Sequence, residues 1–435
     1  MRVIHTGDLN FEETLRRLRQ RGKVFDDDVW TVVSRIVTDV AVRGDQAIFE
    51  YTEKFDGQTI NAGTVMVSSG ERENAIRQAD KEDLEALKLA ADRIEKFHQK
   101  QIIQGCLSSD EEGVELGLQI SPLERVGIYV PGGLACYPST VLMAAIPAMI
   151  AGVEEIFLVT PPRGKRINPL LAAAAKIGGV KQIFRVGGAQ AIAALAYGTE
   201  SIPAVDKIVG PGNAYVAAAK KMVYGQVAID MIAGPSEIVV ISDGTADASL
   251  VAADLLAQAE HDKMASAVLL TPDEELAWRV ASEVKIQLDD LPRKDIAENS
   301  LQEFGAIIVT ESIDEAVAIA NRFAPEHLEL MVENPRKILG RIRNAGAVFL
   351  GYWAPEAIGD YIAGTNHILP TGGTARFSSP LGVHDFVKRT SVISFSREAL
   401  HRYGKEAVRL AKLEGLDGHG RSIAMRMARK KLDKM

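Results

Sequence analysis

A carboxylate and an imidazole stand side by side in this sequence, at Glu326 and His327. Imidazole has an unperturbed pKa of about 6.5, which suits a group that takes up a proton near neutral pH. Because the pair follows Ala324-Pro325, the pattern predicts a helix end, where adjacent side chains point in different directions. The two groups would then serve two separate proton transfers on either side of a substrate. A solvated Glu-His pair without a catalytic role is the alternative that these residues leave open.

Residue types that bind divalent metal ions occur at four further positions. Gln258 and His261 lie three residues apart and share one face of a predicted helix. An amide oxygen and a neutral imidazole both bind divalent cations, and Asp360 and His419 could add a carboxylate and a second imidazole. A zinc site with nitrogen and oxygen donors needs about four such groups. These residues are far apart in the sequence, so the sequence alone does not show whether they come together. For His261 the alternative is a histidine at a helix C-terminus, where the helix dipole favours it.

The stretch from residue 125 to residue 213 repeats one pattern, a short apolar run followed by a Gly- or Pro-rich turn and a helical stretch. This repetition is typical of βα units in a parallel sheet. Ligands of open α/β sheets bind at the carboxyl ends of the strands, where these turns lie. No turn is a full G-x-G-x-x-G, so the standard dinucleotide fingerprint is absent. The strands expected here are 126–130, 156–159, 183–186 and 207–209.

Three polar residues accompany these turns. Tyr129 ends the first expected strand and offers a flat aromatic face, while Gln190 and Asn213 each follow a Gly-rich turn. Both amides can hydrogen-bond an amide or a ribose of a bound ligand. Turn chemistry and helix capping are the alternative explanation, because Asn suits both. Three such turns at successive strand ends favour a binding crevice more than any one of them alone.

The same alternation continues after residue 236. Helical periodicity dominates the first 100 or so residues, with a possible short strand at 65–67, and the end of the chain at 397–434 is strongly helical. The sequence therefore predicts an α/β protein with parallel sheets and helical segments at both ends. The later strands are expected at 237–241, 267–270, 306–309 and 347–350, with helices at 246–261, 274–288 and 313–323 between them.

Composition limits the class of protein. The chain has 435 residues, of which 47% are hydrophobic and 25% charged, and a formal net charge of -8. These values fit a globular protein and argue against nucleic-acid binding. Cys106 and Cys136 form no CxxC pattern, which fits a reducing compartment, and nothing near Cys136 would activate a catalytic thiolate. Without a signal-peptide pattern or an apolar stretch long enough for a bilayer, we expect a soluble cytoplasmic protein.

Taken together, the ordered motifs resemble the histidinol dehydrogenase family over nearly the whole chain, from about Val32 to the C-terminal helix. So many motifs in one order are far more specific than any single one. The motifs that carry the resemblance are Gly127-Ile-Tyr-Val-Pro-Gly-Gly133, Val186-Gly-Gly-Ala-Gln-Ala-Ile192, Gly210-Pro-Gly-Asn213, Asp230-Met-Ile-Ala-Gly-Pro-Ser-Glu237, Gln258-Ala-Glu-His261, Ala324-Pro-Glu-His-Leu328, Gly359-Asp-Tyr, Gly364-Thr-Asn-His-Ile-Leu-Pro370 and Glu414-Gly-Leu-Asp-Gly-His419.

The resemblance implies the oxidation of L-histidinol, through L-histidinaldehyde, to L-histidine with two NAD, the last step of histidine biosynthesis. His327 would take the alcohol proton as hydride leaves, and Glu326 would activate water for the aldehyde stage. The implied zinc ligands, one ion per subunit, are Gln258, His261, Asp360 and His419. The implied substrate contacts are the four zinc ligands, His327, Ser236, His367 and Glu414, and the implied NAD contacts are Tyr129, Gln190 and Asn213.

The resemblance also implies an architecture similar to aldehyde dehydrogenases, with two incomplete Rossmann-like domains. It implies a homodimer in which the C-terminal segment crosses over, so that His419 and Glu414 serve the site of the other subunit. We expect four parts: an N-terminal helical segment (1–25), a discontinuous α/β domain with the metal and catalytic residues (26–124 and 237–370), an NAD-binding domain (125–236) and a dimerisation segment (371–435).

Two other functions compete with this interpretation. A related dehydrogenase could act on another polar alcohol, such as a sulfonated propanediol. Glu414 and His419, which in the first interpretation bind an amine and zinc, favour histidinol. A non-catalytic zinc-stabilised scaffold is the alternative of a different class, and it predicts that loss of His327 leaves function intact.

Overall fold

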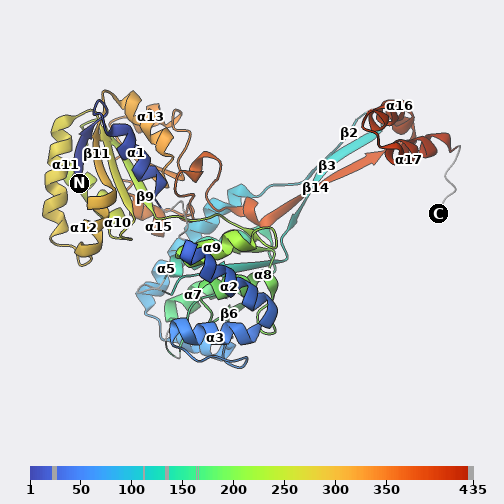
Figure 1. The fold of residues 1–435 in the computed structure, drawn as a ribbon, viewed down its shortest axis with the longest axis horizontal. Coiled ribbons are helices and arrows are strands. Elements are labelled where there is room, and N and C mark those ends of the chain that lie inside the picture. Colours follow the sequence, from blue (N-terminus) through green and yellow to red (C-terminus); the bar gives the residue numbers. More distant parts are fainter. Residues whose placement is uncertain (22–26, 111–112, 133–136, 163, 165, 430–435) are drawn as a thin grey trace. The chain divides into compact units, whose positions relative to one another are not determined.

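The computed structural model describes residues 1–21, 27–110, 113–132, 137–162, 164 and 166–429, and Cys136 lies outside these ranges. The chain divides into two compact units (Figure 1). The first unit consists of Met1–Ile102 and Leu123–Phe386, and it contains two parallel sheets. The second unit consists of Ile103–Pro122 and Val387–Met435, and it contains one antiparallel sheet. The expected α/β class with parallel sheets is confirmed.

The first parallel sheet has five strands in the order β6-β5-β4-β7-β8. The chain runs from β4 outward through β5 to β6 and then returns to the other side of β4, where β7 and β8 follow. The strand order therefore reverses between β4 and β7, which is where open α/β sheets bind ligands. The bounds are β4 Arg125–Tyr129, β5 Glu155–Val159, β6 Gln182–Phe184, β7 Lys207–Val209 and β8 Ala228–Ile229.

Helices cover both faces of this sheet, and each face has its own apolar core. Helices α5 (Lys81–His98), α6 (Pro138–Ala151) and α7 (Pro169–Ile177) pack on one face, and α4 (Ser69–Arg77) packs against α7. Helices α2 (Asp27–Arg43), α3 (Asp45–Asp56), α8 (Gly188–Tyr197) and α9 (Ala214–Val223) share the core of the other face.

The N-terminal helices therefore lie elsewhere than we expected. We had grouped residues 26–124 with the domain that carries the metal and catalytic residues. Instead, the buried stripe Val33, Val37 and Val40 of α2 packs in the core of the five-stranded sheet. Local periodicity shows that such a stripe must be buried, but not which sheet covers it. The possible strand at 65–67 is reduced to a single bridge between Met66 and Phe184.

The second parallel sheet has six strands in the order β1-β11-β10-β9-β12-β13. Helices α10 (Ala248–Ala259), α11 (Glu274–Leu288) and α12 (Lys294–Phe304) pack on one face, and α1 (Phe11–Gln20) and α13 (Ile313–Phe323) pack on the other. The strand bounds are β1 Arg2–His5, β9 Glu237–Ser242, β10 Ser266–Thr271, β11 Gly305–Val309, β12 His327–Met331 and β13 Ala347–Leu350.

Two strands of this sheet contradict our expectations. Arg2–His5 is strand β1, although the N-terminal segment was expected to be helical, and it is stabilised by pairing with β11, some 300 residues away. His327–Met331 is strand β12, whereas we expected only a helix end there. Glu329 in its middle masks the apolar run that would indicate a buried strand.

The second unit has a small antiparallel sheet, β14-β3-β2, and a pair of helices. Its strands are β2 (Cys106–Ser109), β3 (Val114–Pro122) and β14 (Val387–Phe395), none of which was predicted. The expected helical stretch at 397–434 forms two helices, α16 (Arg397–Leu413) and α17 (Asp417–Ala428). Gly415 separates them with a φ of 74°.

Short elements complete the connections of the first unit. None of the helices in the described ranges combines the length and the apolar composition that a bilayer crossing requires. The short elements are α14 (Pro335–Leu339), α15 (Glu356–Tyr361) and the 3-10 turns η1 (Gln99–Gln101), η2 (Thr374–Arg376) and η3 (Val383–Phe386).

The turn after β7 is held by a buried ion pair. Lys220 and Asp230, whose side chains are 3% and 1% exposed, pair with each other. The Lys220 ammonium also donates to the Gly210 carbonyl at 3.0 Å, and the Gly210 N–H donates to Asp230 at 2.7 Å. Gly210 has a φ of 115°, and a Cβ built on it would lie 2.1 Å from the Tyr129 carbonyl oxygen. Only glycine fits this close approach of the two strand ends.

Replacing Gly210 with Ala should lower the free energy of unfolding more than the matched change at Gly225. Gly225 has a similar φ of 107° but has nothing within 4 Å of an added Cβ. Gly225→Ala therefore tests backbone strain alone, worth about 1–3 kcal/mol, and Gly210→Ala adds a backbone clash. Urea unfolding of both variants measures the difference, and equal losses would contradict the close approach.

Candidate active site

The candidate catalytic residues lie at the amino ends of β9 and β12. These strands are neighbours in the six-stranded sheet, with His327 paired to Ile238. The strand order also reverses here, because β10 and β11 follow β9 on one side and β13 follows β12 on the other. Open α/β sheets usually bind ligands at the carboxyl ends of such strands. This sheet instead gathers its acid–base groups at the opposite ends.

A tight turn brings Glu326 and His327 to this position. Helix α13 ends at Phe323, and Ala324 follows with φ 53° and ψ 60°. Ala324 is the one non-glycine residue with positive φ in the part of the chain that the structure describes. Such a conformation costs of order 1–3 kcal/mol and persists only where the surroundings enforce it. Here it reverses the chain within three residues, so that His327 begins a buried strand.

His327 is buried and held in one orientation. Its Nδ1 lies 3.1 Å from Gln258 Oε1, so the hydrogen on Nδ1 donates to that amide oxygen. The other ring nitrogen, Nε2, lies 3.6 Å from a carboxylate oxygen of Glu356. Burial lowers the pKa of His327 to about 4, so that the ring is neutral near pH 7. A neutral imidazole with a free Nε2 lone pair can accept a proton.

Glu326 is a buried carboxyl group with a nearby carboxylate. It is 6% exposed, and its Oε2 accepts a hydrogen bond from the Glu237 N–H at 3.1 Å. Burial, and next the negative charge of Glu237, raise the pKa of Glu326 well above its usual range, while that N–H bond opposes the shift. A carboxyl group with a raised pKa suits general acid–base chemistry near neutral pH.

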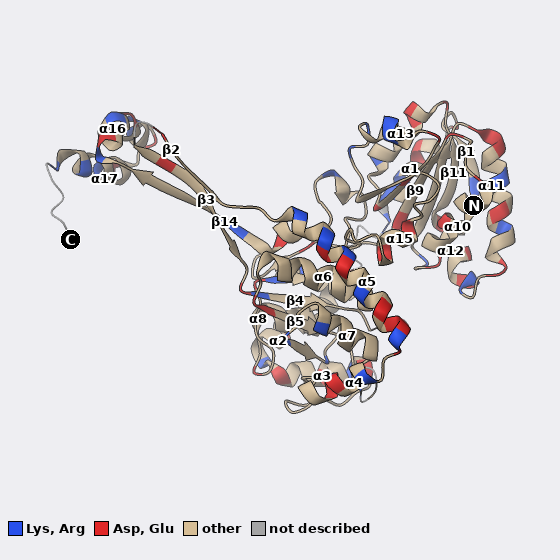
Figure 2. Ribbon diagram, turned by 180° about the vertical axis from the view of Figure 1, so that it is seen from behind, with Lys and Arg blue, Asp and Glu red and all other residues tan. Residues whose placement is uncertain are grey.

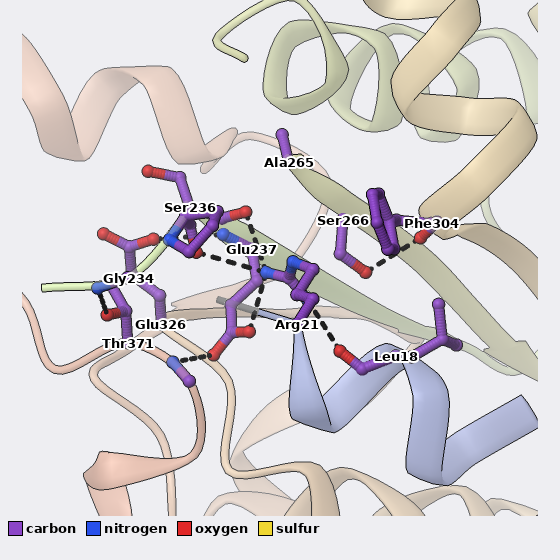
Figure 3. A network of polar contacts seen from close by, with 12 residues as sticks. Leu18, Arg21, Gly234, Ser236, Glu237, Ala265, Ser266, Phe304, Glu326 and Thr371 are labelled. Atoms are coloured by element: carbon purple, nitrogen blue, oxygen red, sulfur yellow. Dashed lines mark hydrogen bonds and ion pairs between the residues drawn. The ribbon is translucent and has the colours of Figure 1, made fainter. Parts of the chain in front are cut away.

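Behind Glu326 lies a buried ion pair that the sequence analysis missed (Figure 3). Arg21 donates to Glu237 at 2.8 Å, and the two side chains are 3% and 1% exposed. The second oxygen of Glu237 accepts from the Gly372 N–H at 3.0 Å. The remaining Arg21 hydrogen bonds go to the carbonyl groups of Leu18, Pro235, Ser236 and Met264. Arg21 thus fixes the backbone segment whose N–H holds Glu326.

Three side chains of types that can bind a metal ion converge near His327. Ligand atoms of His261, Glu356 and Asp360 all lie within 4.8 Å of one another. His261 lies just beyond α10, and the two acids lie one turn apart on α15. The structure therefore brings together two of the four expected zinc ligands and adds Glu356, which the sequence analysis missed. Its spacing of four residues from Asp360 on a helix was the available signal.

Unpartnered polar atoms mark the same place. Gln258 Nε2 and Glu356 Oε1 are both buried and lack a hydrogen-bond partner among the described residues. Buried polar groups are normally satisfied, so each such atom calls for an explanation. A set of imidazole nitrogen and carboxylate or amide oxygen donors suits zinc. The residues present therefore fit a zinc ion, although donors at this spacing also fit other divalent cations.

A carboxylate on β12 holds the helix that carries these acids. Glu329 lies two residues after His327 on the same face of the strand and is 1% exposed. Its Oε1 accepts from the N–H of Glu356, the first residue of α15, at 2.6 Å. Burial is the main cause, and the negative charge of Asp360 the second, that raises the pKa of Glu356 to about 8. One strand therefore supplies His327 and also anchors α15.

His367 lies beside Asp360, and Ser236 lies at the start of β9. The Nδ1 of His367 is 3.0 Å from the Asp360 carbonyl oxygen, and its Nε2 is 3.3 Å from Thr140 Oγ1 on α6. Ser236 is half-buried, and its carbonyl oxygen accepts from Arg21 and from the Ser266 N–H. Both residues therefore lie next to members of the group just described.

Glu414 and His419 belong to the second unit. Glu414 is the C-terminal cap of α16, and His419 lies in the first turn of α17. Both side chains are exposed. Their expected contributions to a metal and substrate site stay predictions.

The expected NAD contacts lie at turns of the five-stranded sheet. Tyr129 is 3% exposed, and its hydroxyl oxygen accepts from the Gly188 N–H at 3.2 Å; burial raises its pKa to about 12. Gln190 is 1% exposed in the first turn of α8. Asn213 is exposed and caps α9, accepting from the N–H groups of Tyr215 and Val216. The structure therefore shows the capping alternative for Asn213.

A small cavity lies at the carboxyl ends of β4 and β5. It is lined mainly by residues of the turns after these strands, and Arg185 closes one side. Gly187 and Gly132 both approach Pro161 so closely that a Cβ on either would lie within 2.7 Å of that ring. The Gly-rich turns therefore pack directly on one another and form the edge of the expected crevice.

A small cavity among Gly- and Pro-rich turns at the carboxyl ends of a parallel sheet, together with a buried acid–base pair and grouped nitrogen and oxygen donors, is typical of a nucleotide-dependent oxidoreductase. Residues 19–427 match the histidinol dehydrogenase family, and the chain belongs to this family. The resemblance predicted from the ordered motifs is confirmed.

Close relatives cover almost the entire chain. Histidinol dehydrogenase of Syntrophotalea carbinolica is 54% identical over 427 residues, which are 98% of this chain and 99% of the relative. The Geobacter sulfurreducens enzyme is 53% identical over 428 residues, 98% of this chain and 100% of the relative. The crystal structure of histidinol dehydrogenase from Elizabethkingia anophelis superimposes with a TM-score of 0.92, at 40% identity, over 98% of both chains.

Replacing Arg21 with Met should destabilise the protein by about 3–5 kcal/mol, because it leaves the Glu237 charge buried without its partner. The matched control is Arg125→Met, which breaks an ion pair with Glu155 in which both side chains are nearly half exposed. That loss should stay below about 1 kcal/mol. Urea unfolding measures both values, and a small loss for Arg21→Met would contradict the role assigned to this ion pair.

Proposed function

We propose that this protein oxidises L-histidinol to L-histidine through L-histidinaldehyde. The overall reaction consumes one alcohol, one water and two NAD⁺, and it yields the acid, two NADH and two protons. The observation that carries the proposal is the placement of His327 and Glu326 next to the donors His261 and Asp360. The membership of the chain in the histidinol dehydrogenase family also supports this proposal.

In the first oxidation, His327 accepts the alcohol proton on Nε2 as hydride passes from the carbinol carbon to the nicotinamide. Two features prepare the imidazole ring of His327 for this step. Burial keeps the ring neutral, and a hydrogen bond to Gln258 holds the hydrogen on Nδ1. In the second oxidation, Glu326 takes a proton from the water that attacks the aldehyde. The resulting hydrate then loses the second hydride, and the carboxylic acid forms.

The residues assigned to zinc are Gln258, His261, Asp360 and His419, with Glu356 as a neighbour that the donor geometry adds. Zinc, when bound, supplies a template that holds the imidazole and amino nitrogens of histidinol. Glu414, Ser236 and His367 are proposed to contact the substrate. The second unit would supply His419 and Glu414.

For NAD, the turns at the carboxyl ends of β4 and β7 are the proposed binding site. Asn213 presents its amide NH₂ group there, and the buried Tyr129 and Gln190 support the turn at Gly188. Residues 125–236 would then act as the NAD-binding domain. The second parallel sheet supplies the acid–base groups, so the hydride passes between groups held by the two sheets.

We further propose a homodimer with shared active sites in the cytoplasm. Large apolar side chains are exposed on both the sheet and the helices of the second unit, including Leu107, Leu116, Ile393, Leu410 and Leu413, at 52–74% exposure. A three-stranded sheet with so little buried apolar surface gains stability from a partner. The free thiol of Cys106 on β2 suits a reducing compartment.

The alternative substrate, a sulfonated propanediol, has no observation in its favour. A coupled assay separates the two: NADH formation at about two equivalents per histidinol supports the proposal, with the stoichiometry set by two successive hydride transfers. Turnover of the sulfonated diol without turnover of histidinol would overturn it.

The two bases should affect different half-reactions. His327→Ala should mainly slow alcohol oxidation, and Glu326→Gln should mainly slow aldehyde oxidation, each by roughly 10²–10⁴-fold. Single-turnover NADH formation from histidinol and from histidinaldehyde separates the two steps. Small and equal effects of both changes would contradict the roles, and an unaffected His327→Ala variant would favour the scaffold alternative.

Removing zinc by chelation should abolish histidinol oxidation and leave NAD binding intact, because the proposed donors and the crevice belong to different sheets. His261→Ala should reproduce this result without a chelator. NAD binding by fluorescence quenching and secondary structure by circular dichroism serve as the readouts. Unfolding upon chelation would instead indicate a structural metal.

Shared sites predict complementation between inactive chains. When His327→Ala and His419→Ala chains are co-expressed, half of the dimers are mixed, and one of their two sites combines intact residues. Activity should recover to about a quarter of the wild-type value. If each site is built from a single chain, every site carries one lesion, and activity stays at the level of the separate variants.

A further inference from the structure

A strongly basic cleft lies on the face of the six-stranded sheet that α1 and α13 cover. Its volume is about 650 Å³, within the range of small-molecule sites. One carboxylate, Asp314, lines it. Figure 2 shows the basic residues of this region in blue along and next to α13. The guanidinium groups that line the cleft are those of Arg19, Arg322, Arg341, Arg343 and Arg376.

These arginines come from four separate segments. Arg19 lies in the last turn of α1, Arg322 in the last turn of α13, and Arg376 in the turn η2. Arg341 and Arg343 lie in the loop between α14 and β13. The protein as a whole has a net charge of -8, so this concentration of positive charge is local.

The loop that carries two of these arginines is held in place by Asn321 of α13. The Asn321 side chain donates to the Arg341 carbonyl at 2.9 Å and accepts from the Arg343 N–H at 2.7 Å. Asn344 donates back to the Asn321 carbonyl at 2.9 Å. The wall of the cleft is therefore ordered before any ligand binds, which lowers the entropy cost of binding.

Acidic side chains neutralise only part of the cleft. Arg322 forms a two-pronged ion pair with Glu12 at 2.6 and 2.9 Å, and Arg341 pairs with Asp314 at 2.8 Å. None of the ion pairs in the described ranges involves the other three arginines of the cleft. Those three arginines are Arg19, Arg343 and Arg376.

Arg19 shows the cost of this arrangement. Its Nε is buried and has no hydrogen-bond partner within the part of the chain that the structure describes. Burial, and next the positive charges of Arg322 and Arg376, lower the pKa of Arg19, and only Glu12 opposes them. Like charges held together without enough counter-charge repel one another, and an anion with several negative charges would remove that repulsion.

We propose that this cleft binds a small phosphate-bearing anion. Guanidinium groups bind phosphate through two parallel N–H···O bonds, and the cleft offers three that form no ion pair with a carboxylate of the described residues. A phosphate group carries up to two charges and several acceptor oxygens, so that it can bridge Arg19, Arg343 and Arg376. None of the lining residues belongs to the acid–base, metal or NAD groups assigned above, so the cleft is a separate site.

The test uses the zinc-loaded full-length enzyme saturated with NAD, so that the NAD crevice is filled. Inorganic phosphate is titrated against chloride at matched ionic strength, with ³¹P line broadening as the readout, and ADP is titrated in a second arm. Saturable phosphate binding supports the proposal, and tighter binding of ADP assigns the site to a nucleotide phosphate. The proposal is overturned if phosphate shows no line broadening, or if chloride displaces the phosphate equally well.

Two variants locate the binding. Arg343→Gln removes an exposed side chain without disturbing the core, and Arg19→Gln with Arg376→Gln removes the other two guanidinium groups. Each should weaken phosphate binding at least about tenfold. The matched control is Arg279→Gln, an exposed arginine on α11 paired with Glu275, which should leave binding unchanged. Unchanged binding in Arg343→Gln and in the double variant would overturn the proposal.

Discussion

The buried ion pair of Arg21 and Glu237 is the contact on which the proposed acid–base end of the six-stranded sheet depends. A carboxylate that is 1% exposed at the start of a central strand is costly unless a cation neutralises it. Arg21 does so and also binds the carbonyl groups of the segment before β9, while Glu237 secures Gly372. The N–H of Glu237 is thereby fixed for Glu326. One charge pair from two distant segments thus positions a proposed general base.

The two parallel sheets of the first unit divide the proposed chemistry. Turns at the carboxyl ends of β4 and β7 are formed by glycine, and Gly210 permits a backbone approach to Tyr129 that no other residue could make. The second sheet presents its acid–base pair at the amino ends of β9 and β12. Burial lowers the pKa of His327, and burial together with the charge of Glu237 raises the pKa of Glu326, so that the surroundings tune both groups for proton transfer.

Local patterns predicted the regular elements of the sheets and helices well. Helices α11 and α13 begin and end at the expected residues, because their apolar periodicity and their caps at Asp273 and Ser312 are local signals. Strands β1 and β14 depend on partners far away in sequence, which periodicity does not report. The same limit explains why Arg21 was missed, because its role depends on a contact made by folding. Glu356 was missed although its spacing of four residues from Asp360 is visible in the sequence. The sequence therefore pointed to His261 and Asp360 by residue type, and only the fold brings them together.

Anomalous diffraction at the zinc edge, from crystals of the zinc-loaded protein, tests the shared site directly. If acid–base and metal-binding groups share one site at the amino ends of β9 and β12, a single strong peak per chain lies between the side chains of His261 and Asp360, within about 2.0–2.2 Å of their donor atoms. A peak at any other place, or no peak at this one, would show that the two groups of residues do not form one site.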